Sequence, residues 1–99
     1  MALLMKPARM SARQACGFLT KVIERGMTVT PTPESRLLVA VIVEAFNDSL
    51  ARHGRDARLF FRDGRMAGYA TALGIAPESV QEFVDTLTAL VKGRKEMPQ

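Results

Sequence analysis

A chain of 99 residues with 47% hydrophobic side chains is long enough for one domain with a modest core and too short for two. One Cys and one His cannot make an internal disulfide or a metal-ligand set, so we expect no metal, no cofactor and a reducing cytoplasmic compartment. The longest apolar run, residues 37–43, is far shorter than the ~20 residues of a membrane-spanning helix, so no membrane partner is expected.

The formal net charge of +4 is concentrated at the N-terminus. Residues 1–33 carry five basic side chains against the single acid Glu24, whereas the charges of the remaining residues balance. Residues 1–10 are predicted to form a flexible basic leader, and Arg9 and Arg13 are candidates for contacts with nucleic-acid phosphates. The absence of acids before Glu24 also resembles an organellar transit peptide, which is an open alternative.

The first helix is predicted over residues 11–25. Ser11 followed by Gln14 matches a capping box, and apolar residues recur behind it at helical spacing. Gly26 is expected to end this helix. Residues 27–33 contain two prolines and are therefore predicted to be extended.

The longest helix is predicted from Pro33 to His53, with Thr32 as its N-cap and Gly54 as its stop. Residues 37–43 are rich in Val and Ile, so a strand is the competing interpretation of this segment. The length of the uninterrupted stretch and its caps favour a helix.

The apolar surface of this long helix is wider than one core contact requires. Its expected core face comprises Leu38, Val41, Ile42, Ala45 and Leu50. The side chains of Val39, Val43 and Phe46 then need another neighbour, which is the first helix, a second copy of the chain or a partner.

Three shorter elements complete the predicted domain. A helix over 55–62 ends at an Asp63-Gly64 turn, and a helix over about 65–73 ends at a turn over 74–76. Pro77 opens the last helix, which closes near residue 92, and residues 94–99 are expected to be a tail. The buried stripe of the last helix is predicted to consist of Val80, Phe83, Val84, Leu87, Leu90 and Val91.

The predicted fold is therefore all-α, a single five-helix domain over residues 11–93 with a helix-turn-helix-like pair over about 65–92. Ala70 is small enough for close helix packing, and Gly74 is suited to the positive φ of the turn. Val80 and Phe83 are expected to insert between the two helices.

Two charged surfaces are the candidate binding sites. The first is a basic stripe of Arg55, Arg58, Arg62 and Arg65, in which guanidinium groups suit phosphate oxygens. The second is the exposed side of the last helix, where Glu78, Gln81, Glu82 and Asp85 suit a basic protein surface, with Val39 and Val43 adding apolar contact.

The segment from residue 34 to residue 84 resembles short uncharacterised helical proteins of phages and mobile elements of alphaproteobacteria. The resemblance implies a phage-type regulatory or host-interaction protein with a helix-turn-helix-like C-terminal half. The matching positions are Arg36-Leu37-Leu38, Ala40-Val41-Ile42, Ala45, Asp48, Ala57-Arg58 and Leu73-Gly74-Ile75-Ala76-Pro77-Glu78-Ser79-Val80.

These observations lead to two hypotheses, and neither is enzymatic, because the sequence offers no nucleophile–base pair. The first is a transcription regulator that contacts DNA through the arginine stripe, Arg9 and Arg13, and that dimerises. The alternative is a protein-binding inhibitor or adaptor of a host complex, including an anti-defence protein, that acts through the acidic side of the last helix. The expected partner is thus DNA or a nucleic-acid-associated protein complex.

Overall fold

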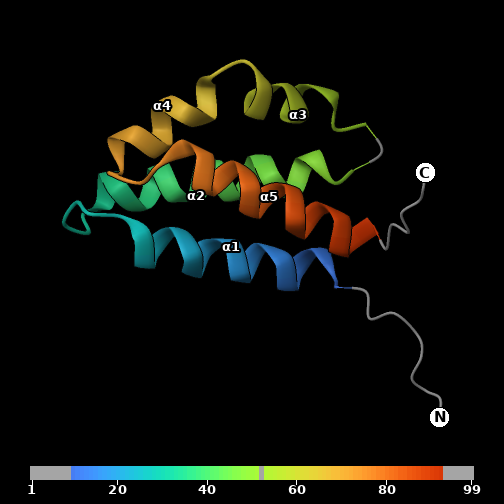
Figure 1. Ribbon diagram of the computed structural model, residues 1–99, viewed down its shortest axis with the longest axis horizontal. Helices are drawn as coiled ribbons and strands as arrows, with labels where there is room; N and C mark the ends of the chain where they lie inside the picture. Colours follow the sequence, from blue (N-terminus) through green and yellow to red (C-terminus); the bar gives the residue numbers. More distant parts are fainter. Residues whose placement is uncertain (1–9, 52, 93–99) are drawn as a thin grey trace, which may run out of the picture.

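The computed structural model describes residues 10–51 and 53–92, which hold five α-helices and no strand (Figure 1). The all-α prediction is thus confirmed, whereas the predicted leader and tail lie outside the described residues, except Met10. The helices are α1 (Ala12–Gly26), α2 (Pro33–Ser49), α3 (Arg55–Arg62), α4 (Arg65–Ala72) and α5 (Pro77–Lys92).

The N-terminal caps follow the sequence patterns. In α1, the Ser11 hydroxyl accepts the Gln14 N–H at 3.1 Å and the Ser11 N–H donates to the Gln14 side chain, also at 3.1 Å. Thr32 caps α2 in the same reciprocal way, because its hydroxyl accepts the Ser35 N–H at 3.1 Å. The chain leaves α1 through an extended Met27, so Gly26 is the last residue of the helix and not a left-handed stop.

Helix α2 ends at Ser49, four residues before the predicted end at His53. The Ser49 hydroxyl donates to the carbonyl of Phe46 at 2.6 Å, and the following residues turn back over the helix end. A Cβ on Gly54 would collide with the carbonyl oxygen of Asp48, so the return path requires glycine. The early end is therefore set by the tight turn that follows Ser49, which helical periodicity does not encode.

The buried face of α2 also differs from the prediction. Val39 and Phe46, which were expected to need another neighbour, lie in the core, whereas Leu38, Val41, Ala45 and Leu50 are only partly buried. Helix α2 packs on α1, α3 and α4, so its core contact is wider than a single stripe. The buried set of α2 is Ser35, Val39, Ile42, Phe46 and Ser49.

Gly74 forms the turn between α4 and α5 at the predicted place. Its φ is +76°, its N–H donates to Thr71 at 3.0 Å and the N–H of Ile75 donates to Ala70 at 3.0 Å, as in a Schellman motif. Thr28, from the α1–α2 connection, donates its hydroxyl to the Gly74 carbonyl at 3.2 Å. A Cβ on Gly74 would collide with that hydroxyl, so the position requires glycine for two reasons.

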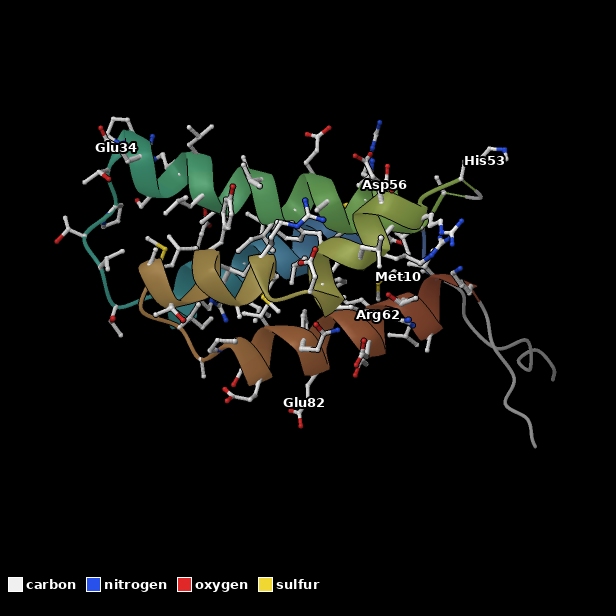
Figure 2. All side chains as sticks on the ribbon, turned by 90° about the horizontal axis from the view of Figure 1, so that it is seen from above. Met10, Glu34, His53, Asp56, Arg62 and Glu82 are labelled. Atoms are coloured by element: carbon white, nitrogen blue, oxygen red, sulfur yellow. The ribbon has the colours of Figure 1, made fainter. Side chains whose placement is uncertain are left out.

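The helices enclose one core. In Figure 1, α5 lies in front of α2, α1 lies below them and the α3–α4 pair lies above; the view from above shows α2 and α5 on opposite sides of the molecule (Figure 2). Leu90 was predicted to be buried but is 41% exposed, because Leu87 and Val91, on a neighbouring side of α5, make the core contacts of its last turns. No described helix has the length and apolar character to cross a membrane. The largest fully buried side chains are Leu19, Ile23, Ile42, Phe46, Leu73 and Val80.

Candidate functional site

Arg58 is bound to the end of α2. Its Nη1 donates to the carbonyl oxygens of Ser49, at 3.1 Å, and Ala51, at 3.3 Å. The negative end of the α2 dipole lies here, and α2 has no basic residue in its own last turn. Arg58 therefore acts as a cap for α2, which the arginine spacing alone did not indicate.

Arg65 is engaged by its neighbours. Its Nε lies 2.9 Å from Oδ2 of Asp63, and its backbone N–H donates to the same carboxylate at 3.1 Å. The guanidinium carbon lies 5.8 Å from the ring centroid of Phe60. Asp63 offsets the charge of Arg65, and the carboxylate also satisfies the first turn of α4.

Arg55 and Arg62 are exposed and form no ion pair with any residue of the described segments. Arg62 borders a cleft of about 180 Å³ between α3 and α5 and a second hollow of about 400 Å³ beside it. Asp85 and Gln81 line both, and Glu78 and Glu82 line the second. The structure thus divides the arginine stripe and brings Arg62 against the acidic helix.

Glu78, Glu82 and Asp85 form an exposed carboxylate row along α5. Glu82 points away from the other helices (Figure 2), and none of the three forms an ion pair with a described residue. The Nε2 of Gln81 donates to Oδ1 of Asp85 at 2.9 Å, which fixes the orientation of that carboxylate. The four α5 residues predicted from the sequence therefore share one side of the helix.

The described part of the chain carries no net charge. It contains nine Lys and Arg side chains and nine Asp and Glu side chains, so the +4 of the full sequence comes from residues outside it. Of the two N-terminal arginines predicted to contact phosphates, Arg9 lies outside the described residues. Arg13 is exposed on α1, which packs on α2 and α5. The helical body is therefore neutral as a whole, with three acids on each of α2 and α5 and three arginines on α3.

Val39 and Val43 do not belong to the α5 surface, contrary to the expectation that they would add apolar contact to it. Val39 is only 6% exposed, and both valines line a groove of about 500 Å³ between α1 and α2. This groove shares no lining residue with the two hollows on α5. The partner surface predicted from sequence is therefore split between two sides of the molecule.

The α1–α2 groove contains Cys16, which the sequence does not mark as a site residue. Its Sγ lies 3.7 Å from Oδ1 of Asn47. Partial burial, and secondarily the charge of Glu44, raise the pKa of the Cys16 thiol. The thiol is therefore protonated at neutral pH, which does not suit a nucleophile. Cys16, Thr20 and Glu24 recur every four residues, so they lie on one side of α1 and line the groove. This spacing is the sequence pattern from which the groove could have been predicted.

Neither a metal cluster nor a relative identifies the site. Within residues 10–51 and 53–92, no group of three or more His, Cys, Asp or Glu side chains is placed to hold a metal ion. Comparison of the chain with family models, curated proteins and solved structures gave no match.

Proposed function

We propose that this chain is a small non-enzymatic protein-binding module that meets a basic protein surface with the carboxylate row of α5, formed by Glu78, Glu82 and Asp85. The observation that carries the proposal is the charge distribution of the helical body. The body is neutral overall, yet Glu78, Glu82 and Asp85 share one exposed side of α5, with no basic residue among them, and make no ion pair with described residues. Complementary charge of this kind gives a protein interface its orientation and a fast association rate.

The environment of the arginines supports this proposal over DNA binding. Arg65 is offset by Asp63, Arg58 caps α2, and Arg62 borders hollows that carboxylates also line. A phosphate backbone approaching Arg62 would also meet Asp85 and Glu82, and like charges at such a contact are unfavourable. The phage-type resemblance suggests the class of partner, which we propose to be a protein of a host complex.

The test is capture from an extract of the source organism with immobilised full-length protein. The double charge reversal Glu82→Lys/Asp85→Lys is expected to remove the captured protein. Reversal of Glu24, an exposed acid on α1, is the matched control and is expected to retain it. Equal capture by both variants, or by neither, would contradict the proposed role of the carboxylate row.

A DNA-binding regulator is the second candidate, and one observation favours it. Arg58 and Arg62 of α3 line a single cleft with Lys92 of α5, so three cations surround a hollow in which Asp85 is the one carboxylate among the described lining residues, and this excess of positive charge suits a phosphate group. In this proposal α4 and α5 act as a helix-turn-helix-like pair, and the turn at Gly74 sets their angle. Loss of DNA affinity in Arg62→Gln, without loss of folding, would favour this candidate.

A further inference from the structure

The outer face of α2 combines a projecting leucine with a hollow. Leu37 is 64% exposed, more than any other large hydrophobic side chain of the described residues. A shallow hollow of about 370 Å³ follows it along the helix. We call this surface the α2 outer face; its residues are Leu37, Ala40, Val41, Glu44, Ala45 and Asp48.

This face has the geometry of a knobs-into-holes contact. Val41, Glu44, Ala45 and Asp48 are spaced at i, i+3, i+4 and i+7, which are the four corners of a hole between helical turns. The alanine corner leaves the hole open to a side chain from another helix. Leu37 lies outside the hole on the same helix, so it cannot fill the hole of its own chain.

One pair of opposite charges along α2, Arg36 and Glu44, fits the same self-complementary arrangement. Arg36 adjoins Leu37, and Glu44 and Asp48 are corners of the hole. Eight residues separate Arg36 from Glu44, or about 12 Å along the helix axis. Arg36 borders the α1–α2 groove, which Glu24 and Glu44 also line, and it forms no ion pair with any described residue, so its guanidinium can reach a second chain from the edge of the outer face.

We propose that two copies of this chain form an isologous dimer through their α2 outer faces, with the two α2 helices antiparallel. Leu37 of each copy enters the hole of the other, and a two-fold axis near Val41 makes both contacts equivalent. In this register Arg36 comes within about 3 Å of the axial level of the other copy's Glu44. The small side chains of Ala40 and Ala45 let the helices approach closely.

The dimer uses a surface separate from the carboxylate row. Helices α2 and α5 lie on opposite sides of the molecule (Figure 2), so both surfaces can be occupied at once. One helix face buries less area than the ~800 Å² per partner of a standard interface. In the antiparallel register Glu34 also comes level with Asp48 of the other copy, and these two carboxylates repel each other. The dimer is therefore weak, and replacement of Glu34 by Lys is expected to strengthen it.

Sedimentation equilibrium of the full-length protein tests the dimer. The weight-average mass is expected to rise from 10.9 kDa toward twice that value as concentration increases into the range of about 1 mM. Leu37→Glu is expected to stay monomeric. Leu59→Glu, at a leucine of α3 that is 43% exposed, is the matched control and is expected to associate like the unmodified chain. A monomer at all concentrations, or a dimer that survives Leu37→Glu, would overturn the proposal.

A charge swap tests the antiparallel register. Arg36→Glu and Glu44→Arg are each expected to weaken association about tenfold or more, because each leaves like charges facing across the interface. The two substitutions together in one chain restore opposite charges and are expected to recover most of the affinity. Failure of the double variant to recover would overturn the register. Glu82→Lys/Asp85→Lys is expected to leave the dimer intact, so failure of the α5 proposal is distinguishable from failure of this one.

Discussion

At the scale of single residues, the turn at Gly74 shows how local and tertiary constraints coincide. The sequence identifies this glycine as a helix stop, and the structure gives it a φ of +76°. The collision between a Cβ at position 74 and the Thr28 hydroxyl comes from a segment 46 residues away. Periodicity and turn propensity do not reveal such a contact.

Replacement of Gly74 by Ala is expected to destabilise the protein by roughly 2 kcal/mol or more, because strain at positive φ adds to the loss of the Thr28 contact. Gly68→Ala is the control, because Gly68 lies inside α4 and a Cβ there meets nothing within 4 Å. It is expected to stabilise by up to about 1 kcal/mol. Urea unfolding measures both, and equal effects would show that the strain and the contact at Gly74 do not matter.

Local residue chemistry determines where the helices begin, and the sequence is correspondingly informative there. The capping pairs at Ser11 and Thr32 and the prolines at the starts of α2 and α5 are all readable as motifs, and each predicted start is within one residue of the observed one. The end and the buried face of α2 were mispredicted. Residues 37–43 are apolar on all sides, so periodicity does not select a face, and the packing of α1, α3 and α4 does.

The same distinction explains what could be predicted of the candidate site. The carboxylate row depends only on which side of α5 is buried, which the apolar stripe of Val80, Val84 and Leu87 sets, and its residues were identified correctly as one side of the helix. The arginines depend on tertiary neighbours. Arg58 binds the end of α2, and Arg65 pairs with Asp63. Their spacing in the sequence therefore predicts one continuous basic surface that the folded chain does not have.

Removal of the N-cap of α2 tests whether the Thr32 side chain stabilises the start of this helix. Thr32→Ala removes the side-chain oxygen that accepts the Ser35 N–H and is expected to cost about 1 kcal/mol of stability. Thr30→Ala, at an exposed position of the same connection, is the control and is expected to change stability by less than about 0.5 kcal/mol. Thermal unfolding of the two variants would contradict the capping role if their midpoints were equal.

At the scale of the whole molecule, charge separates the helical body from the rest of the sequence. The nine acids and nine bases of the described residues balance, so general attraction to a polyanion is not a property of the folded helices. The specific arrangement on the surface then decides the partner. We propose that the carboxylate row of α5 and the outer face of α2 are two separate protein-binding surfaces.

The most direct measurement is the salt dependence of duplex-DNA binding by the full-length protein, compared with Arg55→Gln/Arg62→Gln. If the helical body does not hold DNA, binding is absent or the slope of log affinity against log salt is the same for both proteins. If both arginines contact phosphates, the slope of the variant falls by about 1.8. A fall of that size would contradict the central claim that the helical body binds a protein through α5, and it would identify α3 as a DNA-binding surface.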